Sequence, residues 1–276
     1  MDWFPLCNYT HYSLQKGFSK PAELAKKCAK NYYTACGIAD YKSISGAVSF
    51  YQACVSNNIK PIIGCAFDEF FLFAKNKQGW LELIQIVSSI EPDGTVDNGL
   101  IVKLTKNGNF ICVADDVSKS PIKGDDFYEK TECFREAYYV EKSDAPLHRV
   151  NLCSAMKTTL PKIMQKINTD EQVENRKFFE RDNFFLKDNV QVAELILSDP
   201  KTERFVEIYN KCENYNILNK PMLPTFPTPN NKSEEEYLKD LARKGWVKML
   251  MKTGKIDDEE KKQVYLDRFL MEFDVI

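Results

Sequence analysis

The sequence predicts an α/β protein built on parallel strands. Apolar stretches at residues 34–39 and 60–67 have the length of buried strands, and residues 46–56 between them have the spacing of a helix. Strands that alternate with helices are joined by crossover connections, and crossovers produce parallel pairs. The alternation is typical of a barrel and of a doubly wound sheet alike, so it does not decide between them.

The elements follow one another regularly at the start of the chain. A strand is expected at residues 6–9, and a helix begins near Ser19 and Pro21. One apolar face of this helix contains Leu24, Ala25, Cys28 and Ala29. Further on, residues 99–104 and 109–113 around Asn107-Gly108 predict a hairpin. Helices are expected at 190–197 and 202–215.

The composition changes near residue 220. Residues 220–233, KPMLPTFPTPNNKS, are rich in proline and have no apolar periodicity, so they predict an extended linker. A capping box at Ser233–Glu236 begins a helix that runs to about residue 251, and Asp257 or Asp258 begins a last helix. The predicted organisation is a barrel-like domain at 1–219, a linker at 220–233 and a helical region at 234–276.

Composition and charge limit the possible functions. The chain has 276 residues, of which 43% are hydrophobic, so it can bury a sizeable core. Its 38 basic and 40 acidic side chains give a net charge of −2. A domain that grips the phosphate backbone by itself usually carries a clear basic excess, so an independent DNA-binding domain is disfavoured.

The nine cysteines form no C-x-x-C pair and no zinc-knuckle spacing. Several occupy apolar helix or strand positions, where reduced cysteine behaves as a small hydrophobe. The odd count and the lack of a signal-peptide pattern favour a cytoplasmic protein, and no run is long and apolar enough to span a membrane.

Three segments carry a resemblance to a known family in their order and spacing. They are LCNYTHYSLQKGFSKPAELAKKCAKNYYTACGIADYKSISGAVSFYQACVSNNIKPIIG at residues 6–64, FAKNKQGW at 73–80 and REAYYVEKSDAPLHRVNLCSAMKTTL at 135–160. The chain resembles the PHP (polymerase and histidinol phosphatase) domain at the N-terminus of bacterial DNA polymerase III α subunits. The resemblance implies a distorted (β/α)7 barrel with its site at the carboxyl ends of the strands. It also implies that YLDRFLMEFDVI, at 265–276, lies just before the polymerase palm, and the short region at 115–132 indicates a compact, phage-like version.

Most of the metal ligands of that family are replaced in this chain. The corresponding positions are Cys7, Tyr9, Asp40, Tyr41, Ala66, Glu136 and Tyr138. Neutral phenols, with a reference pKa near ~10, are poor ligands for zinc or manganese, and alanine is none. We expect the tyrosines to fill the vacated pocket and to hydrogen-bond to Asp40 or Glu136, leaving no metal and no catalytic residue. The alternative is a single ion held by Cys7, Asp40 and Glu136.

Other candidate residues have ordinary structural explanations. His11 is expected in a solvated loop, His148 in a packing or capping role, and Cys65 in the core. Lys157, Lys162 and Lys166 could contact nucleic acid, but a solvated helix face is the simpler expectation.

The resemblance implies a scaffold that belongs to a DNA-directed DNA polymerase, a nucleotidyltransferase, and is inactive alone because the palm carboxylates are not in this chain. Its expected partners are the remainder of the polymerase, in cis or in trans, and a proofreading exonuclease subunit, with DNA contacted only through the full polymerase. The alternative function is an active metal-dependent phosphoesterase or 3′–5′ exonuclease with rearranged ligands. A generic βαβα unit without this ancestry is the simplest alternative.

Overall fold

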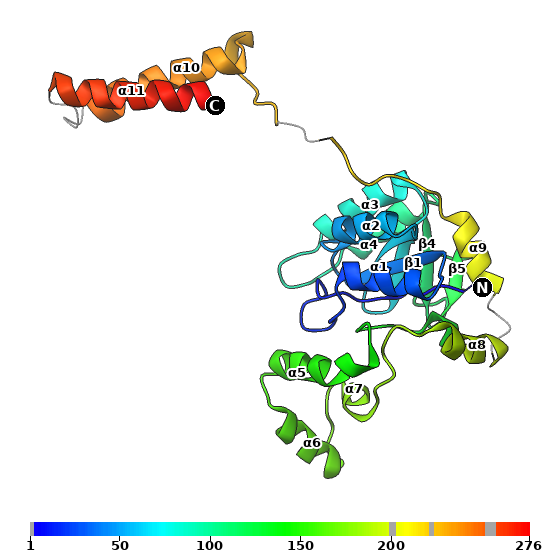
Figure 1. Cartoon of the computed structure of the whole chain (residues 1–276). Helices are drawn as coiled ribbons and strands as arrows, with labels where there is room; N and C mark the ends of the chain where they lie inside the picture. The colour runs from blue at the N-terminus through cyan, green and yellow to red at the C-terminus, as the bar shows by residue number, and fades with distance from the viewer. Residues whose placement is uncertain (1–2, 199–202, 221–223, 252–257) are drawn as a thin grey trace. The chain divides into compact units, whose positions relative to one another are not determined.

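The computed structural model describes residues 3–198, 203–220, 224–251 and 258–276. The chain divides into two compact units, residues 1–219 and 220–276 (Figure 1).

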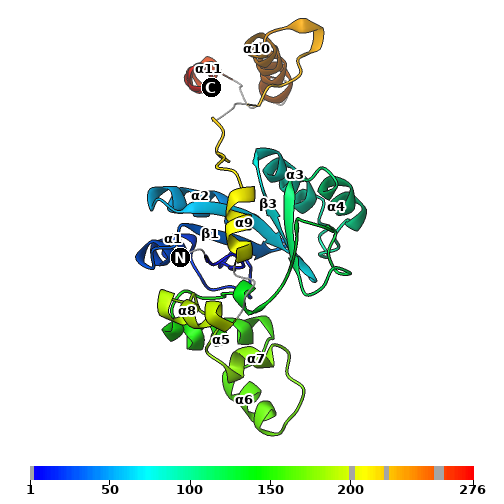
Figure 2. The same cartoon turned by 90° about the vertical axis from the view of Figure 1, so that its right-hand side faces the viewer.

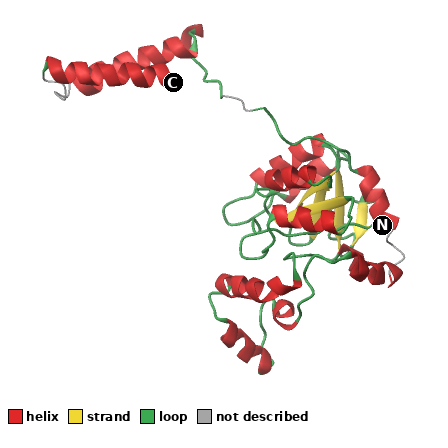
Figure 3. Cartoon of the chain, in the orientation of Figure 1, coloured by secondary structure: helices red, strands yellow, loops and turns green. Residues whose placement is uncertain are grey.

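A five-stranded mixed sheet forms the centre of the first unit, with helices around it (Figure 3). Its strands, in spatial order, are β1 (Ala35–Tyr41), β2 (Lys60–Ala66), β3 (Phe70–Ala74), β4 (Phe110–Ala114) and β5 (Phe127–Glu129). The pairs β1–β2 and β4–β5 are parallel, whereas β2–β3 and β3–β4 are antiparallel. Only residues 67–69 join β2 to β3, which is too short for a crossover, so this pair must be antiparallel.

Nine α-helices of the first unit lie within the described residues. The first four are α1 (Pro21–Lys30), α2 (Ala47–Ser56), α3 (Lys77–Ser88) and α4 (Asn98–Thr105). The others are α5 (Ala145–Ala155), α6 (Leu160–Asn168), α7 (Arg176–Glu180), α8 (Asn189–Ser198) and α9 (Glu203–Lys211). Helices α5, α6 and α7 form a group of their own beside the sheet (Figure 2).

The predicted α/β class is confirmed, and the sheet continues past β1 in the manner of an irregular barrel. Residues 5–10 lie along β1, where the amides of Gly37 and Ala39 donate to the carbonyls of Pro5 and Asn8 at 2.7 and 2.9 Å. On their other side Asn8 forms a parallel bridge with Ala137. The strand expected at 6–9 is therefore an extended segment joined by single bridges.

The hairpin expected around Asn107-Gly108 is wrong. Residues 98–105 form helix α4, because the Asp97 side chain accepts a hydrogen bond from the Leu100 amide at 2.9 Å and caps the first turn. Gly108, with φ +75°, belongs to the turn that leads from this helix into β4 rather than to a two-residue hairpin loop.

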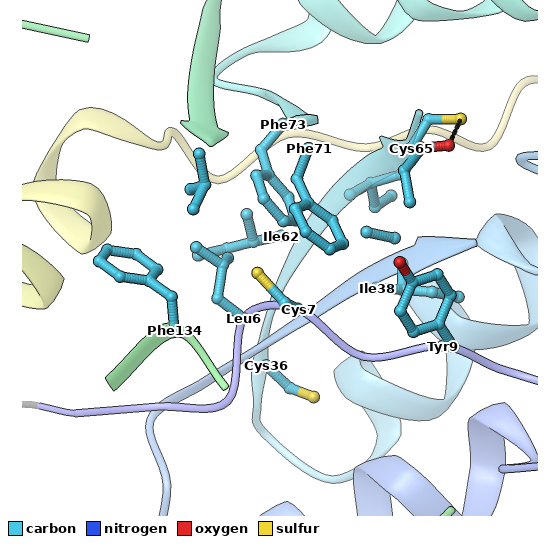
Figure 4. Packing of buried hydrophobic residues seen from close by; sticks show 14 of the residues in the cluster. Leu6, Cys7, Tyr9, Cys36, Ile38, Ile62, Cys65, Phe71, Phe73 and Phe134 are labelled. Atoms are coloured by element: carbon cyan, nitrogen blue, oxygen red, sulfur yellow. Dashed lines mark hydrogen bonds between the residues drawn. The ribbon is translucent and has the colours of Figure 1, made fainter. Parts of the chain in front are cut away.

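The core of the first unit is apolar and contains the side chains of all nine cysteines, which are buried. Figure 4 shows side chains from residues 6–9, from β1, β2 and β3, and from Phe134 meeting in one cluster. Each fully buried large side chain contributes about 1.5–3 kcal/mol to folding. The cysteines thus act as small hydrophobes, as their apolar positions predicted.

The second unit contains α10 (Glu234–Gly245), a π-helical turn (Trp246–Met251) and α11 (Glu259–Val275). The capping box predicted at Ser233–Glu236 is present, with hydrogen bonds of 3.2 and 3.1 Å, and Asp258 caps α11 by accepting from the Lys261 amide at 2.7 Å. Trp246 packs against Phe269 with ring centroids 6.2 Å apart. None of the described helices of the chain is long and apolar enough to cross a membrane.

Gly37 allows residues 5–10 to approach β1, and its replacement tests that packing. A Cβ atom on Gly37 would lie 2.2 Å from the Leu6 carbonyl oxygen. Gly37→Ala should lower the free energy of unfolding by about 1–3 kcal/mol, measured by urea unfolding followed by tryptophan fluorescence. Gly245→Ala, in α10, where a Cβ atom would meet nothing within 4 Å, is the control and should not lower the stability of the first unit. Equal stability of the two variants would contradict the proposed close packing.

Candidate functional site

The predicted site residues lie on neighbouring segments at one end of the sheet. Asp40 and Tyr41 end β1 and are paired in register with Cys65 and Ala66 of β2. Cys7 and Tyr9 come from residues 5–10, which lie beside β1, and Glu136 and Tyr138 come from residues 136–140, which pair with residues 5–10 on their other side. The backbone pairing thus brings the segments that carry these seven positions next to one another.

Asp40 is only 1% exposed and its carboxylate is fully engaged by its neighbours. Its Oδ1 accepts hydrogen bonds from the Thr10 amide at 2.7 Å and the Ser13 hydroxyl at 2.6 Å, and its Oδ2 accepts from the Thr10 hydroxyl at 2.7 Å. Burial raises the pKa of Asp40, and these hydrogen bonds oppose that effect. Thr10 and Ser13 are two polar residues just after the expected first strand, and no sequence pattern marks them as site residues.

Tyr41 is directed toward the rim of this site and not toward Asp40 or Glu136, so that part of the prediction is wrong. Its hydroxyl donates to Asp68, a residue that the sequence analysis did not single out. Asp68 also forms an ion pair with Lys42 at 2.8 Å, whose hydrogen bond lowers the pKa of Asp68. The Lys16 ammonium lies 3.5 Å from the centroid of the Tyr41 ring, a cation–π contact.

Glu136 belongs to a second polar cluster, which is partly buried. The Tyr138 hydroxyl donates to Glu136 Oε2 at 2.6 Å, as predicted, and the Tyr138 ring stacks on Tyr9 with centroids 4.6 Å apart. Lys130 forms an ion pair with the same carboxylate. Burial alone would raise the pKa of Glu136, but Lys130 and Tyr138 together bring it below its usual value. Lys130 lies in the polar stretch that gave no pattern in the sequence.

These donors do not fit a metal centre. The two carboxylates already have hydrogen-bonding or cationic partners, and burial raises the pKa of the Cys7 thiol, which favours the neutral form over the thiolate that binds metals. Within the described ranges no three His, Cys, Asp or Glu side chains form a group that could hold an ion. The geometry therefore gives no support to the single ion considered for Cys7, Asp40 and Glu136.

The two histidines and Cys65 lie outside any catalytic arrangement. His148 is buried, with Nε2 2.6 Å from the Lys16 carbonyl oxygen and Tyr139 and Phe178 rings around it, and burial lowers its pKa. His11 is exposed, with Nδ1 3.2 Å from the Ser19 carbonyl oxygen. Burial raises the pKa of the Cys65 thiol to about 12, so this thiol stays protonated. The side chains of Lys157, Lys162 and Lys166 are exposed.

The Lys130–Glu136 pair gives a test of this site by stability. Lys130→Met leaves Glu136 buried without its counter-charge, and we expect a loss of about 2 kcal/mol near neutral pH, measured by urea unfolding. In the wild type the lowered pKa of Glu136 stabilises the fold at pH values above the pKa of the unfolded state. This contribution is lost as the pH falls through the pKa of the folded state. In the variant burial is opposed only by the Tyr138 hydrogen bond and the weaker effect of the Lys177 charge, so the pKa of Glu136 rises above its wild-type value. The penalty should therefore shrink as the pH falls and Glu136 becomes protonated.

Lys119→Met is the matched control for this experiment. Lys119 pairs with Asp115 at 3.7 Å on the surface, and both side chains are more than one third exposed. Such a pair contributes about 0–1 kcal/mol. An equal effect of the two substitutions would show that Lys130 does not neutralise a buried charge.

Comparison with known proteins shows the family of the chain. A family model described as "PHP domain" matches residues 6–189. DNA polymerase III subunit alpha of Pseudomonas aeruginosa is 26% identical, and the alignment covers 97% of this chain and 28% of that protein. The same subunit of Buchnera aphidicola is 27% identical with the same coverage, and that of Bacillus subtilis is 22% identical over 100% of this chain and 28% of its own length. The chain thus spans little more than a quarter of the length of these relatives.

A solved structure of a candidate metal-dependent phosphoesterase from Bifidobacterium adolescentis was also matched. It covers 70% of this chain and 95% of its own, at 10% identity and with a TM-score of 0.30, a value too low to carry an argument. The family assignment rests on the sequence match, which spans most of the first unit. The chain belongs to the PHP domain family.

Proposed function

We propose that this chain is the PHP module of a cytoplasmic replicative polymerase of the DNA polymerase III α type, and that it acts as a scaffold without hydrolysing phosphoesters. The observation that carries this proposal is the alignment of 97% of the chain with DNA polymerase III subunit alpha, together with the replacement of its metal-site residues. The module supports DNA synthesis by holding the polymerase body, and a proofreading exonuclease subunit is a further partner. DNA is contacted through the whole polymerase.

The chemistry of the first unit supports a non-hydrolytic role. Metal-assisted hydrolysis of a phosphoester needs several ligands that bind the cations, activate water and shield the phosphate charge. Here Asp40 is occupied by Thr10 and Ser13, and Glu136 is neutralised by Lys130. Neither carboxylate is free to coordinate a cation or to accept a proton from water, so we assign no catalytic step to this site.

The second unit supports a docking role. On α11, Phe269 contacts Trp246 of the π-helical turn and Phe273 contacts Lys239 of α10, so both rings face the preceding helical segment. By helical spacing, Val264, Met271 and Val275 lie on the opposite side of α11, and they are 64, 50 and 81% exposed. Met271 and Val275 are one turn apart, and neighbouring exposed apolar residues of this kind mark interaction sites. We assign this face, named the outer face of α11, to contact with the polymerase body.

The absence of hydrolysis can be measured directly. The purified chain, incubated with manganese or zinc, should release no phosphate from p-nitrophenyl phosphate and no nucleotide from a 3′-terminated oligonucleotide above the rate of an Asp40→Asn variant. Asparagine can keep the Thr10 and Ser13 hydrogen bonds, so the variant should remain folded. Stoichiometric metal after chelator-free purification, with hydrolysis that Asp40→Asn abolishes, would establish the alternative function of a phosphoesterase or exonuclease with rearranged ligands.

The outer face of α11 predicts self-association of the isolated chain. In sedimentation velocity the weight-average sedimentation coefficient should rise with protein concentration, because association of two chains buries the exposed apolar face. Met271→Glu should abolish this rise. Val102→Glu introduces the same charge at an exposed apolar position of α4 and should leave the rise unchanged. A wild-type chain that stays monomeric at every concentration contradicts the assignment.

A further inference from the structure

A second polar site lies beside Glu136, in a groove of about 250 Å³. One wall is formed by residues 130–136 and the other by residues 177–184. The volume is below the range of roughly 300–1,000 Å³ that encloses a drug-sized ligand, so the groove suits one small group.

The groove contains more positive than negative charge. Of its four cationic side chains, Lys130 pairs with Glu136 and Arg135 pairs with Glu132. The remaining two are Lys177 and Arg181, and neither forms an ion pair with any residue that the structure describes. With both acidic residues of the groove engaged, the net charge of the lining is about +2 at neutral pH.

Two neutral polar atoms in the same groove lack partners. Thr131 Oγ1 and Asn183 Oδ1 are buried and make no hydrogen bond in the described part of the chain. An unsatisfied buried polar atom costs about 1–3 kcal/mol, and native proteins usually complete such atoms with water or a ligand. The threonine hydroxyl can donate a hydrogen bond, and the asparagine amide can donate when its oxygen and nitrogen exchange places.

We propose that this groove, lined by Lys177, Arg181, Thr131 and Asn183, binds a phosphate group without a metal ion. The planar guanidinium of Arg181 can donate two parallel hydrogen bonds to an oxyanion, and Lys177 adds a point charge. A phosphate monoester carries close to two negative charges and presents oxygens in several directions, which matches the charge and the spread of these donors. A carboxylate has one charge and two coplanar oxygens, so it would satisfy fewer of them.

The contacts of Lys177 hold its charge at the groove. Its ammonium lies 5.0 Å from the centroid of Phe178 and 5.7 Å from that of Phe184, within the range of cation–π contacts. Phe178 is itself buried in the core, so one of these rings is fixed. Lys177 is therefore positioned by aromatic rings. Its charge also helps to lower the pKa of Glu136, but it forms no ion pair with a carboxylate in the described part of the chain, so it can still attract an anion.

Calorimetric titration in the presence of EDTA tests the proposal. Inorganic phosphate and thymidine 5′-monophosphate should each bind the full-length chain at one site, and thymidine should not bind. Arg181→Gln and Lys177→Gln should each weaken the binding of both anions by about tenfold or more. Both side chains are exposed, so these variants should fold normally, as thermal melting would verify. Lys162→Gln removes the same charge from exposed α6 and should bind like the wild type.

The source of the phosphate is decided by a second titration with single-stranded oligothymidine. Binding only to a 5′-phosphorylated strand and to the mononucleotide would assign the groove to a terminal phosphate. Equal binding to an unphosphorylated strand would assign it to the backbone of DNA, and the affinity should then fall steeply with salt. No heat of binding at millimolar phosphate, or equal binding by the wild type and Arg181→Gln, would overturn the proposal.

Discussion

Asp40 accepts three hydrogen bonds in the interior of the first unit, and through them it holds residues 10–13 over the end of β1. This anchoring matters because residues 5–10 have no regular ladder with β1 and are joined to it by single backbone bonds. Hydrogen bonds to a charged acceptor contribute about 1.5–3 kcal/mol each. Asp40 corresponds to a metal ligand of the family, but here it has a structural role, because its hydrogen bonds fix the segment that contains Tyr9. That segment pairs in turn with the segment that contains Glu136.

The internal ion pair of Lys130 explains how the second carboxylate persists without a cation from solution. A buried carboxylate without a partner would raise its pKa and become neutral. The Lys130 ammonium supplies the compensating charge, and the Tyr138 hydroxyl supplies a hydrogen bond. Because both partners belong to the chain, the charge balance is complete within the fold. Beside the tyrosines of the pocket, Lys130 thus supplies a positive charge, which neutral phenols cannot supply.

Sequence patterns predicted the elements whose signals are local. The N-cap at Ser233, the apolar face of α1 and the buried strands β1 and β2 depend on neighbouring residues, so they could be read from one segment. Helix α4 was not predicted, because the Asn107-Gly108 pair is as typical of a hairpin turn as it is of the end of a helix. The Tyr41–Asp68 bond could not be found, because the side-chain direction of Tyr41 depends on packing between segments distant in sequence.

The net charge of −2 argues against an independent DNA-binding domain, but it does not exclude a local site for an anion. Net charge determines the long-range field, whereas a site depends on which side chains pair locally. Around α7, Asp182 pairs with Arg149, and Asp170 and Glu180 pair with Arg176. These carboxylates form ion pairs with cations outside the groove. Lys177 and Arg181 therefore have no ion-pair partner among the described residues, although the chain has slightly more acidic than basic residues. Such a local excess is invisible in the composition, since it arises only when the fold distributes the ion pairs unevenly.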